Sequence, residues 1–150
     1  MKKNLIVALA LLCGSAFAAD TFSGPSTSER LTAARKAIDA KDWTRAKTEL
    51  DAALREDPRN ADVHNLLGYS YRKRANPDLP KAFEHYNTAL KLNPNHKGAH
   101  EYIGEAYLMD KKPAEAEKHL AALEKICGNK TCEEYEDLAK SIDAYKTANK

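Results

Sequence analysis

The sequence predicts an all-α protein in which three helix pairs stack as an α-solenoid and a C-terminal helix caps the last pair. The first observation is repetition, because Ala46, Ala82 and Ala116 recur after 36 residues (46 to 82) and 34 residues (82 to 116). The second is the placement of Pro58 and Pro94 where one pair would end, since proline does not continue a helix. One pair cannot bury its apolar face alone, so the pairs are expected to stack.

The pairs are expected at about residues 27–60, 61–96 and 97–126 of a domain that spans residues 28–150. Ser26 followed by Glu29 has the spacing of a capping box and predicts a helix start near Thr27 or Ser28.

The C-terminal segment does not repeat the pattern of a helix pair. Thr131 followed by Glu134 again has capping-box spacing, and apolar residues then recur on one helical face. This predicts a capping helix over about residues 131–147 that seals the third pair.

Residues 1–18 have the features of a cleaved secretory signal. Lys2 and Lys3 precede an apolar stretch over residues 5–12, and Ala-Phe-Ala follows at 16–18. Cleavage is expected after Ala18, with Ala19 as the alternative. Residues 19–27, rich in turn formers, are expected to form a flexible tether.

Two other interpretations of this segment compete with a cleaved signal. A membrane-anchoring helix is disfavoured because the apolar stretch is too short to cross about 30 Å of hydrocarbon. A lipid anchor on Cys13 is disfavoured because Leu12 occupies a position that favours a small residue. The mature chain is therefore expected in the periplasm or outside the cell, with no membrane span.

The charge balance argues against nucleic acid as a partner. The chain has 24 Lys plus Arg and 22 Asp plus Glu, and cleavage would remove Lys2 and Lys3 to leave 22 of each. There is no basic excess for nucleic acid and no polybasic block for an anionic membrane.

The repeats resemble the tetratricopeptide repeat family. The second pair carries a family-like set, namely His64, Leu67, Gly68, Tyr71, Ala82, Tyr86, Ala89 and Pro94. The third pair carries a similar set, namely His100, Ile103, Gly104, Tyr107, Ala116 and Leu120. The first pair keeps mainly its second helix. The resemblance implies a right-handed solenoid in which Gly68 and Gly104 each admit the paired helix closely, beside Ala82 and Ala116.

The resemblance also implies a concave groove, lined by the first helix of each pair, that accepts a protein or peptide. The groove-facing positions hold Arg35, Asn65, Tyr69, Arg72, Glu101, Tyr102 and Glu105. Tyr69, Arg72 and Glu105 are expected to be exposed there and to contribute little to folding. A family subclass clamps a C-terminal carboxylate with Lys and Asn, and this sequence lacks that clamp.

Histidines and cysteines are the only groups that suggest other chemistry. His64 and His100 share one repeat position, and His85 and His119 share another, so packing or surface placement is favoured over a metal site. Cys127 and Cys132 lack the spacing of thiol oxidoreductases, and an even pair in an exported protein favours a disulfide.

No catalytic motif is found, so the protein is expected not to be an enzyme and to need no cofactor. The favoured function is a periplasmic interaction module or scaffold whose partner belongs to the cell envelope. A metal or redox accessory that uses the His and Cys residues is the alternative, and self-association through the solenoid ends is a further possibility. The turn over residues 72–80 is two residues longer than its counterpart, and a solvated loop is the favoured interpretation.

The signal interpretation predicts a mature N-terminus at Ala19 or Asp20 in the soluble periplasmic fraction. N-terminal sequencing of protein from its native cell tests this. Recovery of Met1, or of the protein in a stable membrane fraction, would contradict it.

Overall fold

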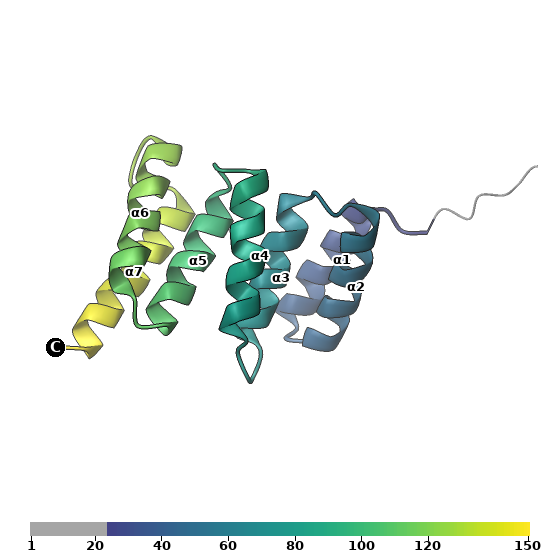
Figure 1. Ribbon diagram of the computed structural model, residues 1–150, viewed down its shortest axis with the longest axis horizontal. Coiled ribbons are helices and arrows are strands. Elements are labelled where there is room, and N and C mark those ends of the chain that lie inside the picture. The colour runs from purple at the N-terminus through teal and green to yellow at the C-terminus, as the bar shows by residue number, and fades with distance from the viewer. Residues whose placement is uncertain (1–23) are drawn as a thin grey trace, which may run out of the picture.

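The structure is a computed structural model that describes residues 24–150, and these residues form seven helices that stack side by side along one long axis (Figure 1). The expected signal over 1–18 and most of the expected tether lie outside the described residues. The helices, in chain order, are α1 (Thr27–Asp39), α2 (Trp43–Glu56), α3 (Ala61–Lys73), α4 (Leu79–Leu92), α5 (Lys97–Met109), α6 (Pro113–Cys127) and α7 (Glu133–Ala148). None of them is both long and apolar enough to span a bilayer.

The helices form two layers with different contacts. Helices α1, α3 and α5 each pack on the even-numbered helix that follows, as the repeats predict. The odd-numbered helices also contact one another, α1 with α3, α3 with α5 and α5 with α7. Within residues 24–150, α2, α4 and α6 make no such contacts with one another. The layer of α1, α3, α5 and α7, which we call the inner layer, therefore lies on the concave side of the row.

Side-chain caps define most of the helix starts. Ser26 and Glu29 form the predicted capping box, with Ser26 accepting from the Glu29 backbone and Glu29 accepting from the Ser26 backbone. The predicted cap at Thr131 is wrong. The Thr131 backbone and hydroxyl both donate to the Asn129 side-chain oxygen, at 2.9 and 3.0 Å, so Cys132 becomes the N-cap of α7. The Asn129 turn outcompetes the helix for that hydroxyl.

The two repeat glycines are not equivalent. A Cβ on Gly68 would lie 2.6 Å from the Tyr86 ring of the paired helix α4, as expected. A Cβ on Gly104 would instead meet Leu138 of α7, at 2.7 Å. The atoms nearest to a Cβ on Gly104 therefore belong to the capping helix, whereas those nearest to a Cβ on Gly68 belong to the paired helix. Leu120 replaces Tyr86 in the third pair and is shorter, and the capping helix occupies this position.

The capping helix α7 completes the last pair. Leu138 and Ile142 are buried with Leu108, Ala116 and Leu123 in one apolar cluster. Burying side chains of this size contributes about 1.5–3 kcal/mol each. These contacts attach α7 to α5 and α6 and cover their apolar faces, which fits the prediction of a capping helix.

We predict that Gly68→Ala lowers the free energy of unfolding by about 1–3 kcal/mol, because the fully buried Tyr86 ring has no space to move aside. Gly98→Ala is the matched control, since its Cβ would meet mainly the end of the Asn65 side chain at 3.2 Å. Urea denaturation of both variants tests this. Equal stabilities would show that the α3–α4 contact is not as close as the structure indicates.

Candidate partner-binding site

Six of the seven predicted groove residues lie on α3 and α5, and three of them, Tyr69, Tyr102 and Glu105, contact one side chain. That side chain is Arg72, near the end of α3. Its Nε donates to the Tyr86 hydroxyl of α4 at 3.3 Å. Its Nη2 lies 2.5 Å from the Glu105 carboxylate of α5, in a close ion pair whose angles are not those of a directional hydrogen bond. Arg72 thus contacts three successive helices.

Two tyrosines lie on Arg72 at the inner layer. The rings of Tyr69 and Tyr102 are 4.8 Å apart between centroids and tilted by 53°. The Arg72 guanidinium lies 5.3 Å from the first ring centre and 5.6 Å from the second. Both rings are partly exposed. A cation beneath two rings fixes their positions and holds an aromatic surface ready for a partner.

The same surface presents acceptors that lack donors. Glu101 is only 9% exposed, and no hydrogen bond or ion pair from the described residues reaches its carboxyl group. Burial, together with the nearby carboxylates of Glu105, Asp137 and Glu134, raises the Glu101 pKa to about 8. The Asn65 side-chain oxygen is also buried without a partner. A buried amide oxygen of this kind is costly unless a donor arrives.

The structure corrects part of the predicted groove. Arg72 is 5% exposed, so the expectation of an exposed side chain that contributes little to folding is wrong for this residue. Glu105 is partly buried in the same ion pair and also accepts from Ser141 of α7 at 3.2 Å. Arg35, on α1, is exposed and makes no contact with this cluster. We define the inner-face cluster as Asn65, Tyr69, Glu101 and Tyr102, supported by Arg72 and Glu105.

The histidines form two matching pairs between the helices of a repeat. In each pair the two Nδ1 atoms face each other, at 3.1 Å for His64 and His85 and 2.9 Å for His100 and His119. The Nε2 of His64 lies 3.1 Å from the Pro58 carbonyl, and that of His100 lies 2.9 Å from the Pro94 carbonyl. A carbonyl only accepts, so Nε2 carries the proton and Nδ1 accepts from the partner ring. This arrangement needs a neutral ring at His64 and at His100, whose Nδ1 atoms accept, and it explains the shared repeat positions by packing.

The cysteine corner offers few metal ligands. Within residues 24–150, the only group of three potential ligands is Cys127, Cys132 and Glu134. The structure joins the two sulfur atoms, at 2.06 Å, in the turn between α6 and α7. In that form the corner has no thiolate, and a single carboxylate does not make a metal site.

Comparison with known proteins agrees with this geometry. The sequence profile of the tetratricopeptide repeat family matches residues 31–94 and 74–130, more than half of the chain. The chain therefore belongs to the tetratricopeptide repeat family, whose members are protein-interaction modules. A search of curated proteins found no match.

Two solved structures share the fold at low sequence identity. One is in the TPR2B-domain:pHsp70 complex of yeast Sti1, with a TM-score of 0.70 at 16% identity, covering 81% of this chain and 97% of that chain. The other is the type III secretion translocator chaperone SycD of Yersinia enterocolitica, with a TM-score of 0.70 at 16% identity, covering 87% of this chain and 99% of that chain.

Sequence reasoning missed two contributors to the cluster. Tyr86 was identified only as part of the repeat pattern of the second pair, yet its hydroxyl also accepts a hydrogen bond from Arg72. Ser141 was not singled out, because its role depends on how α7 docks on α5. A basic residue on the groove-facing side of α3, followed by an acidic residue on α5, was the available signal for the Arg72–Glu105 pair.

We predict that Glu101→Gln becomes more stable relative to the wild type as pH rises from 5 to 9. The Glu101 pKa is raised from 4.5 to about 8, so the folded state holds a proton that the unfolded state has lost, and wild-type stability falls across this window. After discounting for solvent screening, the gain at pH 9 is about 1–3 kcal/mol. Thermal unfolding at several pH values tests this, and a pH-independent difference would contradict it.

We predict that acid weakens the histidine pairs. Burial and the neighbouring His100 lower the His119 pKa from 6.5 to about 4. The folded state therefore binds fewer protons, and the stability present above pH 6.5 is lost as pH falls toward 4. A His100→Phe, His119→Leu variant should lose less stability over this range than the wild type.

His96→Asn is the matched control, because asparagine can keep the N-cap bond that His96 makes to the Ala99 backbone. It should retain the wild-type pH dependence. Urea denaturation between pH 4 and 7 measures both variants. If the free energy of unfolding of the double variant falls with decreasing pH as steeply as that of the wild type, the histidine pairs do not cause the loss of stability in acid.

Proposed function

We propose that the chain is a non-enzymatic interaction module that binds an extended segment of another protein across the inner-face cluster. The observation that carries this proposal is the combination of two positioned tyrosine rings with the Asn65 side-chain oxygen, which is buried without a donor, and the largely buried Glu101 carboxyl group. A partner that covers the rings and supplies donors to Asn65 and Glu101 satisfies both.

The charges indicate the chemistry of the partner. Three carboxylates surround Glu101, whereas the Arg72 guanidinium is already paired with Glu105. A lysine, an arginine or backbone N–H groups of the partner would therefore be favoured beside Glu101. Such a donor stabilises the charged carboxylate, so binding should tighten as pH rises from 6 to 9.

The proposed location is the periplasm or the cell exterior, and the proposed partner belongs to the cell envelope. The N-terminal signal pattern and the paired Cys127 and Cys132 support this location. Alkylation of freshly isolated protein without reductant would test the pairing, since two reactive thiols would oppose it.

Photo-crosslinking in the native cell tests the binding face. We expect a photoreactive phenylalanine analogue at Tyr102 to form an adduct with a partner protein. The same analogue at Lys118, whose side chain is 69% exposed on the outer helix α6, is the matched control. Added Tyr69→Ala should abolish the adduct at position 102 without changing the melting temperature by more than a few degrees.

Two outcomes would contradict the proposal. Adducts that form at position 118 but not at 102 would place the partner on the outer layer. An adduct at 102 that persists with Tyr69→Ala and Glu101→Gln combined would show that the cluster does not recognise the partner.

A further inference from the structure

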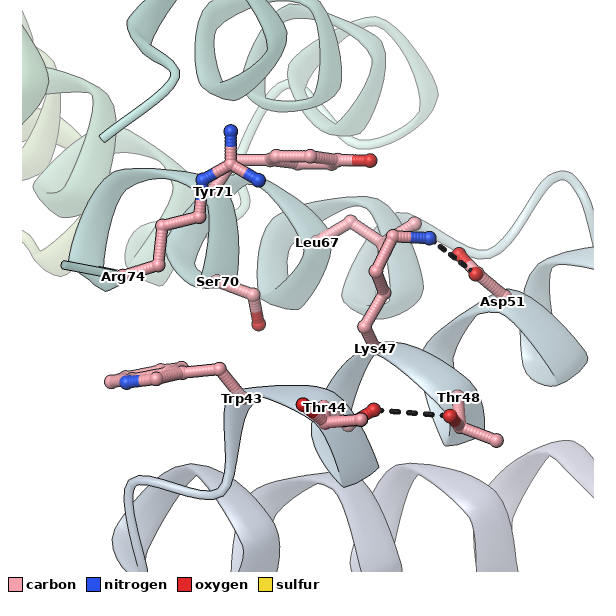
Figure 2. A pocket seen from close by; sticks show the side chains of 9 residues that line it. All are labelled: Trp43, Thr44, Lys47, Thr48, Asp51, Leu67, Ser70, Tyr71 and Arg74. Atoms are coloured by element: carbon pink, nitrogen blue, oxygen red, sulfur yellow. Dashed lines mark hydrogen bonds and ion pairs between the residues drawn. The ribbon is translucent and has the colours of Figure 1, made fainter. Parts of the chain in front are cut away.

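A cavity lies outside the inner-face cluster, between α2 and α3 (Figure 2). Its volume is about 380 Å³, within the range of small-ligand sites. The lining residues come from both helices and the turn after α3, and they are Trp43, Thr44, Lys47, Thr48, Asp51, Leu67, Ser70, Tyr71 and Arg74. None of these residues belongs to the inner-face cluster.

The next repeat shows what normally fills this space. Counting 36 residues onward, Lys47 corresponds to Phe83 and Tyr71 to Tyr107. Between α4 and α5, the Phe83 ring lies 4.7 Å from the Tyr107 ring, tilted by 41°. Each tyrosine also stacks on a histidine of the next even-numbered helix, Tyr71 on His85 and Tyr107 on His119. The cavity between α2 and α3 exists because Lys47 stands where Phe83 fills the corresponding space between α4 and α5.

A buried hydroxyl marks the interior of the cavity. Ser70 is 8% exposed, and its hydroxyl oxygen has no hydrogen-bond partner among the described residues. The hydroxyl points into the space between the two helices, on the side of Trp43 and Thr44 (Figure 2). The corresponding residue one repeat later is Ala106, which has no polar side-chain atom. An unpaired buried hydroxyl is costly, so a ligand that bonds to it gains affinity.

The charges at the rim favour an electron-rich ring. Lys47 pairs with Asp51, whereas Arg74 and Lys81 share Asp78, at 3.2 and 3.9 Å, so each cation near the cavity already has a carboxylate partner. The Arg74 guanidinium lies 5.1 Å from the Tyr71 ring centre. A second ring beside Tyr71 would meet the same cation, and cation–π attraction is strongest for indole and phenol rings.

We infer that the cavity between α2 and α3 binds a phenol- or indole-type ring. The ring lies against Tyr71 as Phe83 lies against Tyr107, and its hydroxyl or N–H bonds to Ser70. The ring can belong to a free small molecule or to a Tyr or Trp residue of another chain.

Trp43 provides a specific reporter, because it is the only tryptophan in the chain and it lines the cavity. In ¹⁵N-labelled protein its indole N–H gives a single cross-peak. Titration with p-cresol or indole should shift this peak in a saturable way, with a millimolar dissociation constant. Toluene, which has the ring of p-cresol without the hydroxyl, should bind about three- to tenfold more weakly.

Two variants that copy residues of the next repeat locate the site. Lys47→Phe should close the cavity and weaken p-cresol binding at least tenfold. Ser70→Ala should keep the cavity and the toluene affinity but reduce p-cresol affinity to that of toluene. Both replacements reproduce residues found one repeat later, so both are expected to fold. Phenylalanine in place of the exposed Lys91 of α4 is the control and should bind as the wild type does.

N-acetyltyrosinamide distinguishes the two sources of the ring. If it binds at least as tightly as p-cresol, the ring belongs to a polypeptide, and if only the free phenol and indole bind, it belongs to a small molecule. The inference is overturned if neither p-cresol nor indole gives a saturable shift. It is also overturned if Lys47→Phe binds as the wild type does, or if toluene matches p-cresol.

Discussion

The buried guanidinium of Arg72 is the interaction on which the inner layer depends. It starts on α3, bonds to the Tyr86 hydroxyl of α4 and pairs with Glu105 of α5. Loss of either partner would leave the buried guanidinium uncompensated and would strongly destabilise the fold. The three helices are therefore constrained to one relative placement. In a solenoid each repeat contacts only its neighbours, so this one side chain, which we call the Arg72 node, fixes how α3, α4 and α5 are placed relative to one another.

This node also links stability to recognition. Tyr69 and Tyr102 lie on the Arg72 guanidinium and remain partly exposed, so the side chain that joins the repeats also positions the aromatic surface. Glu105 continues the connection to α7 through Ser141. The capping helix therefore does more than cover apolar residues, because it holds the carboxylate that neutralises Arg72. A partner would meet a surface that is already ordered, which reduces the entropic cost of binding.

The sequence predicted the fold well because repetition is a strong constraint. The helix pairs, the start of α1 and the capping helix all follow from residue spacing, and the packing of the histidines follows from their shared repeat positions. Side-chain depth was harder to predict. Arg72 was assigned to the surface because it holds a groove-facing position of the repeat, and only the three-dimensional approach of Tyr86 and Glu105 makes its burial possible.

The departures from repetition are where sequence reasoning fell short. Gly104 contacts α7 because Leu120 is shorter than Tyr86, and that consequence depends on a helix outside the repeat. Lys47 in place of Phe83, and Ser70 in place of Ala106, were visible in the alignment of the repeats. Their consequence, a cavity between α2 and α3, became clear only from the structure. The spacing that recurs between the repeats thus predicted the architecture, whereas residues that differ from one repeat to the next produce the sites.

The central claim is that Arg72 and Glu105 act as one structural unit across the repeats. A double-mutant cycle with Arg72→Met and Glu105→Gln, measured by urea denaturation at pH 7, tests it most directly. We expect each single variant to be destabilised and the double variant to recover part of the loss, with a coupling free energy of about 1.5–3 kcal/mol. Additive effects, with a coupling below about 0.5 kcal/mol, would contradict the account.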